Sequence, residues 1–397
     1  MSSESITGLD IQRLSQLAET HGTPLWVYNL NRVRENVSAL RCALDTLSPD
    51  ALGAYSIKAN RRPEVLRCLA DSGLGAEAAS HAEVELALEA GFPPQDIIFN
   101  GPWKTREQIA AAMHAGILVN VDSMDELHIV LSLTPPIGRV GLRVSLDLGE
   151  DMEQDRFGLD PSQLVQAGRA LSEAGLSLAA LQAHWGSYTL RKGDGPTSLR
   201  TEVVWPQPGR AAHVLEQLLQ ATRTVREACG LVPEVLDVGG GLPSADLLEQ
   251  ELSQVAIVFE EAKTWLRPRP RLLFEPGRAL VWDAGHLLTR VVARRTASRG
   301  QAIVVDAGIN VLPAAATTEL AIEPVLPHPG PESHTTVFGS LCLQNDVLAW
   351  SAILPPLEPG DLLLIPNVGA YNDARSAPFI FQLPGAVFEG ATGDSQF

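Results

Sequence analysis

The chain has 397 residues, of which 45% are hydrophobic and 19% charged, and this length and composition indicate a globular enzyme of two domains. Its formal net charge of -17 argues against nucleic acid as a partner, because phosphates attract a basic surface. The sequence shows neither the basic and apolar blocks of a signal peptide nor an apolar run long enough to span a membrane, so we expect a cytoplasmic protein without a membrane partner. Its cysteines lack zinc spacing, so we expect them to be reduced and to bind no metal. They are Cys42, Cys68, Cys229 and Cys342.

Short apolar segments alternate with amphipathic helical stretches from residue 50 onward. Because the segments are apolar throughout, they predict parallel strands buried on both faces. Eight of them within about 230 residues predict a closed (β/α)8 barrel. The predicted strands are residues 52–58, 75–79, 96–100, 117–121, 139–145, 178–185, 234–240 and 271–277.

Three of the helical stretches begin with the same pair of residue types. A serine or threonine is followed three positions later by glutamate or glutamine, which is the spacing of a capping box. Their role in starting helices explains these residues without a functional role. The pairs are Ser80 and Glu83, Thr105 and Gln108, and Ser123 and Glu126.

Beyond residue 280 the sequence changes to β-branched runs split by proline and glycine. This texture predicts an antiparallel β domain, which residues 23–29 are expected to join. We therefore expect a barrel domain over 28–280 that binds the cofactor. Residues 1–27 and 281–397 would form the β domain, with a share in the dimer interface and the active site.

Lys58 ends the stretch YSIKAN, where a buried strand is predicted to stop. Three interpretations are open for this lysine. It could be an ordinary surface residue, a clamp for a phosphate or carboxylate, or a nucleophilic amine that forms a Schiff base.

Other residues lie at the C-terminal ends of the remaining predicted strands, and a barrel enzyme keeps its active site at these strand ends. The glycines of DVGGGLP would let backbone N–H groups approach an anion, although such turns are common. Arg278 could complete an anion site, but nearby Glu275 suits a ligand that also carries a cation. The residues at the strand ends are Lys58, Glu77, Asn100, His184, Gly239, Gly240, Gly241, Glu275, Gly277 and Arg278.

Pyridoxal phosphate is a cofactor that fits all these groups. It has an aldehyde for a lysine, a phosphate for glycines and arginine, and a ring nitrogen for a carboxylate. His184 could stack on its ring, or it could be a core histidine with a satisfied hydrogen bond.

Motifs along almost the whole chain resemble the fold-type III pyridoxal-phosphate decarboxylases, the group of diaminopimelate, ornithine and arginine decarboxylases. Several such motifs in one order make the resemblance specific. The motifs are YSIKAN (55–60), ASHAE (79–83), HWGS (184–187), DVGGGLP (237–243), FEPGR (274–278), VDAGIN (305–310), GSLCLQND (339–346) and GAY (369–371).

The resemblance implies a role for each matching residue. Lys58 would bind the aldehyde of the cofactor, His184 would stack on its ring, and Glu275 would pair with the ring nitrogen. Cys342 would enter from the partner subunit of a homodimer with shared sites and would protonate the carbon that has lost CO2. The phosphate would be held by Ser187, Gly239, Gly240, Gly241, Gly277, Arg278 and Tyr371.

The match is weaker where the family binds the far end of its substrate. The family commonly has an acidic residue after the cysteine, but this chain has Leu343, with Asp346 later in the same loop. Residues 311–325 also lack the arginine and tyrosine of diaminopimelate enzymes. Unpaired charges are costly to bury, so Cys342, Leu343 and Asp346 are expected to line a site for an amino acid with a neutral, acylated or carrier-bound end, as in siderophore or antibiotic pathways.

Other functions stay open at this point. One is diaminopimelate decarboxylation in lysine biosynthesis, and another is amino-acid racemisation on the same barrel. The cysteine loop favours decarboxylation over racemisation. A non-catalytic descendant would be expected to lose Lys58 or Cys342, and the chain keeps both.

Overall fold

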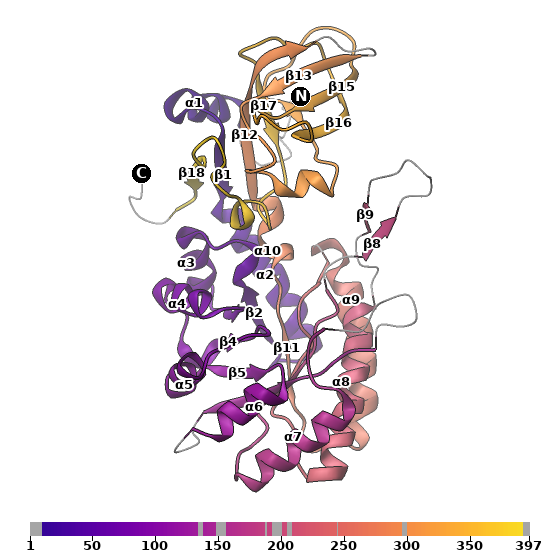
Figure 1. Ribbon diagram of the computed structural model, residues 1–397. Coiled ribbons are helices and arrows are strands. Elements are labelled where there is room, and N and C mark those ends of the chain that lie inside the picture. The colour runs from indigo at the N-terminus through magenta and orange to yellow at the C-terminus, as the bar shows by residue number, and fades with distance from the viewer. Residues whose placement is uncertain are drawn as a thin grey trace. The chain divides into compact units, whose positions relative to one another are not determined.

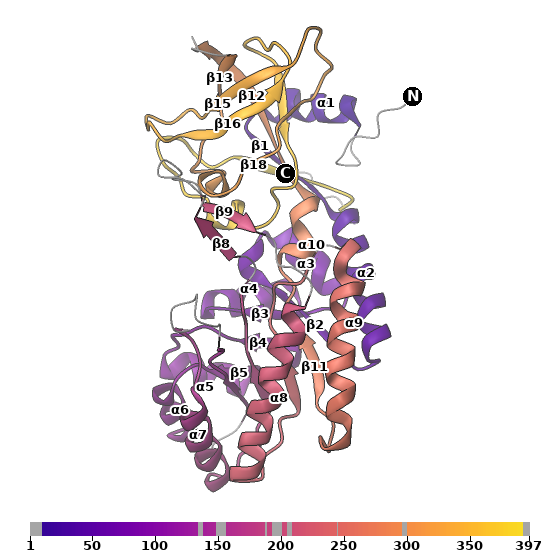
Figure 2. The ribbon, with the colours of Figure 1, turned by 90° about the vertical axis from the view of Figure 1, so that its right-hand side faces the viewer.

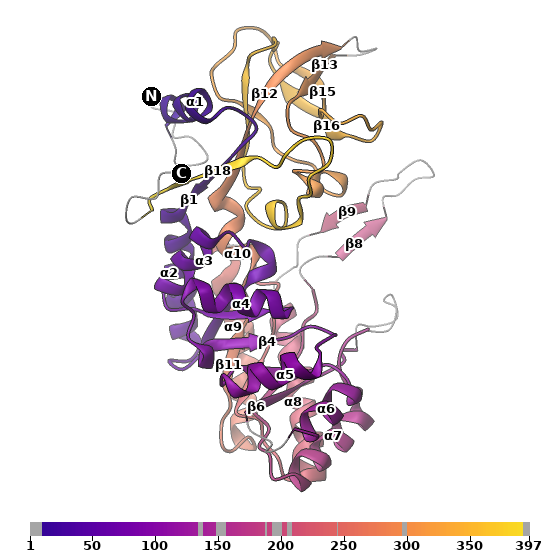
Figure 3. The ribbon, with the colours of Figure 1, turned by 60° about the vertical axis from the view of Figure 1, so that its left-hand side comes forward.

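The computed structural model describes residues 10–133, 138–147, 156–186, 189–192, 201–204, 209–243, 245–295 and 300–391 (Figures 1–3). The chain divides into two units. One consists of Arg34–Thr189 and Trp205–Ala279, and the other of Met1–Val33, Leu190–Val204 and Leu280–Phe397. The domain boundaries drawn from the sequence at residues 28 and 280 stay a prediction.

Eight parallel strands of the first unit close into a barrel, which confirms the fold predicted from the sequence (Figure 1). The last strand returns to the first through the pair Leu273 and Leu52. Apolar side chains such as Ile98, Leu118 and Val235 form one buried cluster among the strands. The strands are β2 (Leu52–Ser56), β3 (Gly75–Ala78), β4 (Ile97–Phe99), β5 (Leu118–Val121), β6 (Arg139–Arg143), β7 (Ala180–Gln182), β10 (Val235–Asp237) and β11 (Arg271–Phe274).

Helices follow the barrel strands, and α8 and α9 lie side by side (Figure 2). No helix in the described segments is long and apolar enough to cross a bilayer. The helices are α2 (Leu30–Leu47), α3 (Pro63–Asp71), α4 (His81–Ala90), α5 (Arg106–His114), α6 (Met124–Leu131), α7 (Pro161–Glu173), α8 (Arg210–Cys229) and α9 (Ala245–Glu261), with the 3₁₀ turns η2 (Pro94–Asp96) and η3 (Ala262–Thr264).

The predicted helix starts are confirmed, but only one is a full capping box. The side chains of Ser80, Thr105 and Ser123 each accept a hydrogen bond from the backbone N–H three residues on. Gln108 returns the bond to Thr105. The carboxylates of the other two pairs bond instead to the backbone N–H one residue before the cap, at Ala79 and Asp122.

Lys58 does not lie in a strand, contrary to the prediction. Strand β2 ends at Ser56, and Lys58 belongs to the 3₁₀ turn η1 (Ile57–Ala59). The turn is fixed from within, because the Tyr55 hydroxyl donates a hydrogen bond to the carbonyl of Asn60 at 3.0 Å. The amine is therefore carried on a short, braced turn at the mouth of the barrel.

The second unit is built on an eight-stranded sheet that β1 joins, as predicted (Figure 3). Most of its pairs are antiparallel, but β1 with β18 and β13 with β15 are parallel, so the predicted antiparallel sheet is a mixed one. The remaining elements are α1 (Ile11–His21), β1 (Leu25–Asn29), β8 (Thr189–Lys192), β9 (Thr201–Val204), α10 (Arg278–Val281), η4 (Trp282–Ala284), β12 (Gly285–Arg295), β13 (Gln301–Val305), η5 (Pro313–Ala316), β14 (Glu323–Pro324), β15 (Ser333–Phe338), β16 (Val347–Leu354), β17 (Leu362–Ile365), η6 (Asp373–Arg375) and β18 (Gly385–Glu389).

Candidate active site

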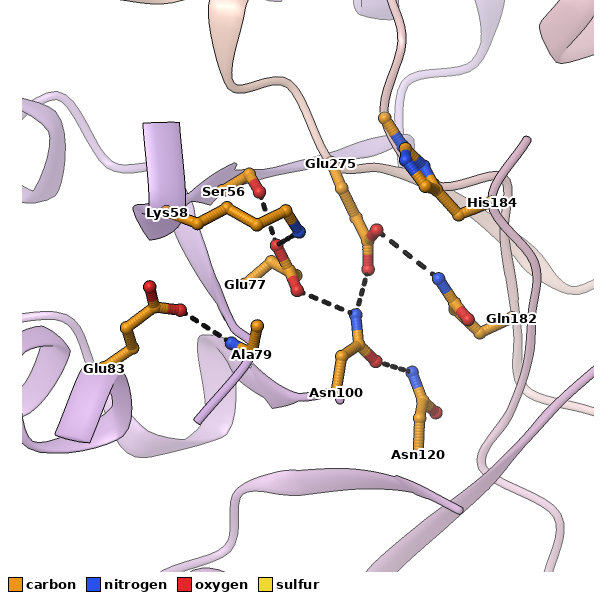
Figure 4. A network of polar contacts seen from close by, with 12 residues as sticks. Ser56, Lys58, Glu77, Ala79, Glu83, Asn100, Asn120, Gln182, His184 and Glu275 are labelled. Atoms are coloured by element: carbon orange, nitrogen blue, oxygen red, sulfur yellow. Dashed lines mark hydrogen bonds and ion pairs between the residues drawn. The ribbon is translucent and has the colours of Figure 1, made fainter. Parts of the chain in front are cut away.

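Lys58 and Glu77 form an ion pair where β2 and β3 end (Figure 4). The Lys58 ammonium lies 2.7 Å from Glu77 Oε2, and the Ser56 hydroxyl donates to the same oxygen at 2.5 Å. The side chain of Glu77 is 1% exposed, whereas that of Lys58 is 40% exposed. The amine is thus accessible from the barrel mouth while its counter-ion is buried.

The charge of Glu77 is maintained by its neighbours. Burial alone would raise the pKa of Glu77, but the charge of Lys58 and hydrogen bonds from Lys58, Ser56 and Asn100 hold this pKa below its ordinary value. Glu77 is therefore an anion at neutral pH. A buried anion at this place favours a positive charge on the Lys58 side chain.

Side-chain amides connect Glu77 to a second buried carboxylate, Glu275, which follows β11 (Figure 4). Asn100 Nδ2 donates to Glu275 Oε1 at 2.6 Å and to Glu77 Oε1 at 3.3 Å. Asn120 Nδ2 donates to Asn100 Oδ1 at 2.8 Å. Gln182 Nε2 donates to the other oxygen of Glu275 at 3.4 Å. One hydrogen-bonded network therefore extends across the barrel mouth.

Glu275 and Asp237 are buried acids with raised proton affinity. Burial and the negative charge of Glu77 raise the pKa of Glu275 to about 7, although the charge of Lys58 and hydrogen bonds from Asp237 and Asn100 oppose this rise. Burial and the proximity of Glu275 raise the pKa of Asp237 well above its ordinary value. Without a cationic ligand, Asp237 therefore favours its protonated form at neutral pH, whereas Glu275 is divided between its two forms.

His184 follows β7 and is held against a glycine turn. The backbone N–H of Gly240 donates to His184 Nδ1 at 2.9 Å, so this nitrogen carries no proton. Burial, together with the charges of Lys58 and Arg143, lowers the pKa of His184 to about 3. The imidazole is therefore a neutral, flat ring at physiological pH.

The glycine turn after β10 has room only for glycine. Gly239 has a φ of +75°, in the left-handed region that favours glycine. A Cβ on Gly240 would lie 2.6 Å from the carbonyl oxygen of Glu275 and 3.2 Å from His184 Cε1. The bare backbone of this turn thus approaches the ring of His184 and the backbone of Glu275.

The structure gives positions for some of the other residues that are predicted to bind phosphate. Gly241 has a φ of +89° in the same turn. Gly277 directly follows the segment that carries Glu275, and Arg278 begins α10. Ser187 lies outside the described residues. The phosphate roles of these residues stay predictions.

The predicted residues of the second unit lie on loops. Cys342 is an exposed free thiol, and Leu343 is 41% exposed. Asp346 is buried, and its carboxylate accepts hydrogen bonds from the backbone N–H groups of Ile309 at 2.8 Å and Leu341 at 2.7 Å. Asp346 therefore braces the cysteine loop, and its contact with substrate stays a prediction. Tyr371 has a φ of +60°, which is uncommon for a residue other than glycine.

The sequence reasoning missed four polar residues of this network. They share one signal, because each is a polar residue within an otherwise apolar strand or at its last position. Such a residue is costly to bury unless it has a partner, so its position alone marks it for attention. The four residues are Ser56, Asn120, Gln182 and Asp237.

These groups fit pyridoxal phosphate. An accessible amine suits its aldehyde, a neutral imidazole suits the face of its ring, and a buried carboxyl with a pKa near 7 suits its ring nitrogen. The glycine turn, which a Cβ would obstruct, suits close approach of a phosphate. Fold and site together define a (β/α)8-barrel enzyme that uses pyridoxal phosphate.

Comparisons with known proteins give the family. Residues 30–192 match the family described as pyridoxal-dependent decarboxylase, pyridoxal binding domain. The chain is 30% identical to the diaminopimelate decarboxylase of Methanothermobacter thermautotrophicus, over 92% of this chain and 86% of that protein. It is 28% identical to that of Aquifex aeolicus, with the same two coverages of 92% and 86%.

A solved structure agrees in fold. The lysine/ornithine decarboxylase of Vibrio vulnificus in complex with putrescine superimposes with a TM-score of 0.80 at 22% identity, over 96% of this chain and 98% of that one. The chain belongs to the fold-type III pyridoxal-dependent decarboxylases. It is an amino-acid decarboxylase that depends on pyridoxal phosphate.

Proposed function

We propose that this decarboxylase removes one of the two α-carboxylates of diaminopimelate as CO2. The proposal depends chiefly on the relatives, since several of those named diaminopimelate decarboxylase match 90% or more of this chain. It replaces our first expectation, from the sequence, of a substrate with a neutral far end. A substrate of that kind is the second candidate.

We propose that the barrel residues hold the cofactor in the following way. Lys58 Nζ binds the aldehyde, His184 lies against the ring, and Glu275 faces the ring nitrogen. The glycine turn and Arg278 bind the phosphate, together with Tyr371. When bound, pyridoxal phosphate supplies an electron sink that stabilises the negative charge developing at the α-carbon as CO2 leaves.

Two side chains of the enzyme then handle protons. Glu275 keeps a proton at the ring nitrogen, because an anionic carboxylate stabilises a cationic ring. Cys342 Sγ delivers a proton to the α-carbon after CO2 has left. The exposure of this thiol in the described chain supports its access to a substrate. Asp346 supports the loop that carries it.

We propose that the enzyme is a homodimer whose subunits share their active sites. The family resemblance supports this assembly. A run of exposed apolar side chains in the second unit also supports it, because contiguous apolar patches on a protein surface mark interaction sites. These side chains are Phe379, Ile380, Phe381 and Leu383.

A second candidate substrate is an amino acid with a neutral, acylated or carrier-bound far end. Leu343 supports it, since a leucine after the cysteine cannot pair with a distal ammonium. Residues 311–325 contain no arginine, lysine or histidine to pair with a distal carboxylate. Both charges of the far end of diaminopimelate would then need partners elsewhere.

A substrate panel distinguishes the two candidates. CO2 release would be measured as kcat/KM for meso-diaminopimelate, L-lysine, L-ornithine and Nε-acetyl-L-lysine. A preference for diaminopimelate supports the first proposal, and a preference for the acylated amino acid supports the second. Failure to decarboxylate any of these amino acids by a cofactor-loaded enzyme would contradict both.

Leu343 offers a sharper test with a matched control. Leu343→Glu should raise kcat/KM for lysine over that for the acetylated form, whereas Leu343→Met keeps an apolar side chain of similar size and should change little. If the two variants behave alike, Leu343 does not contact the far end of the substrate.

A further inference from the structure

The side-chain nitrogen of Asn100 donates hydrogen bonds to both buried carboxylates, those of Glu77 and Glu275. Its Nδ2 group has two hydrogens, and it donates to Glu275 Oε1 at 2.6 Å and to Glu77 Oε1 at 3.3 Å. Asn100 is 4% exposed, and the two glutamates are buried as well. In such a place each hydrogen bond to a charged acceptor is stronger than in water.

A hydrogen bond from Asn120 fixes the orientation of the Asn100 amide. Asn120 Nδ2 donates to Asn100 Oδ1 at 2.8 Å, so the oxygen of Asn100 faces Asn120 and its nitrogen faces the carboxylates. A flipped amide would place an oxygen against two anions. The Asn100 amide therefore has one orientation, with its nitrogen toward Glu77 and Glu275 and its oxygen toward Asn120.

The sequence makes room for this arrangement at Gly141. Strand pairing places Gly141 of β6 beside Asn120 of β5, and a Cβ on residue 141 would collide with Asn120 Oδ1. Only glycine at this position leaves space for the side chain of Asn120. The amides of Asn100 and Asn120 thus depend on Gly141, a residue that takes no part in the ion pair between Lys58 and Glu77.

We propose that Asn100 is a positioning residue that holds Glu77 against Lys58 and keeps Glu275 turned toward the ring nitrogen of pyridoxal phosphate. The inference rests on the proposed function, which places the ring nitrogen at Glu275. The Asn100 hydrogen bond lowers the pKa of Glu275 against burial and the charge of Glu77, which raise it. Asn100 therefore favours the proton on the ring nitrogen over the proton on Glu275.

The test compares Asn100→Leu, which removes both donors at similar size, with the parent and with Gln182→Leu. Gln182 is a matched control, because its amide also donates to Glu275, but at 3.4 Å and to that carboxylate alone. Each protein is loaded with pyridoxal phosphate labelled with ¹⁵N in the ring. The ¹⁵N chemical shift reports protonation of the ring nitrogen without reference to activity.

In Asn100→Leu we expect the ring nitrogen to lose its proton at a pH lower by about 1–2 units than in the parent, the effect of one lost hydrogen bond to a charged group. The cofactor should also dissociate more readily, by about 10- to 100-fold. Gln182→Leu should shift the same titration by less than half as much. Equal ¹⁵N titrations for Asn100→Leu and the parent would overturn the inference.

Two further variants keep the result interpretable. In Glu275→Gln the ring nitrogen should also lose its proton at a lower pH than in the parent. If it does not, Glu275 does not lie at the ring nitrogen, and the proposed role of Asn100 is wrong as well. If Asn100→Leu does not fold, Asn120→Leu carries the test, since it only frees the Asn100 amide to turn. A ring titration in Asn120→Leu identical to that of the parent would then refute the proposed role.

Discussion

The Glu77→Gln substitution tests the electrostatics of the site most directly. It removes one buried negative charge at nearly constant side-chain volume. Because that charge helps to raise the pKa of Glu275 to about 7, the substitution should lower the pKa of Glu275. The Lys58 ammonium, released from its ion pair, would act on Glu275 in the same direction.

The geometry gives the size of this effect. The facing oxygens of Glu77 and Glu275 share the donor Asn100 Nδ2. Two unit charges about 6 Å apart, which is the limit that this shared donor sets, interact by about 3 kcal/mol at an effective dielectric constant near 20. This energy corresponds to about two pKa units. We therefore expect the pKa of Glu275 to fall to about 5 in Glu77→Gln.

The assay is a pH titration of cofactor-free protein labelled with ¹³C at glutamate Cδ. The signal of Glu275 is identified by its loss in Glu275→Gln. Ser56→Ala is the control, because it removes a hydrogen bond to Glu77 and leaves every charge in place. If Glu77→Gln leaves the Glu275 midpoint where the parent has it, or if Ser56→Ala shifts it equally, the charge of Glu77 does not set the proton affinity of Glu275.

The remaining predictions concern turnover, stability and assembly. Lys58→Ala should abolish CO2 release and the absorption band of lysine-bound cofactor, and a variant that kept the band would show that another group binds the aldehyde. The pKa of Glu275 is raised in the folded protein from 4.5 to about 7, so the stabilisation from its protonated form is complete below 4.5 and is lost as the pH rises through about 7. Urea unfolding of cofactor-free protein should show this as a contribution of up to about 1.4 kcal/mol per pH unit to the slope, in addition to that of Asp237. Glu275→Gln should remove the contribution of Glu275 and make the slope shallower; an unchanged slope would contradict the burial argument. Mixing Lys58→Ala with Cys342→Ala should restore about a quarter of the active sites, because half the dimers would be mixed and each would hold one intact site. The double mutant mixed with the parent is the control, and subunit exchange without recovered activity would place Cys342 and Lys58 of one site in the same chain.

The barrel and its ligand-binding strand ends could be predicted from the sequence for a physical reason. Parallel strands buried on both faces are apolar throughout, so they stand out from the amphipathic helices between them. Lys58, Glu77, Asn100 and Glu275 lie at or just after the ends of such strands, and the closed barrel brings their side chains together. Chain order alone was enough to place these residues at one mouth.

The contacts among these residues could not be predicted. The sequence does not show that Lys58 pairs with Glu77, because both could face an incoming ligand. The turn that carries Lys58 depends on a bond from Tyr55 to Asn60, which no strand pattern reveals. The parallel pairs of the second unit were missed in the same way, since a parallel pair there joins segments that are distant in sequence.

The site has more buried acids than cations among the groups described at its centre. Glu77 keeps its charge because Lys58 lies beside it, whereas burial raises the pKa of Asp237 well above its ordinary value and that of Glu275 to about 7. A ligand that brings its own positive charge to Glu275 would replace the proton and remove the cost of ionising that carboxylate in a buried place. The burial that makes Glu275 a weak acid in the free protein therefore makes it a strong partner for a cationic ring nitrogen.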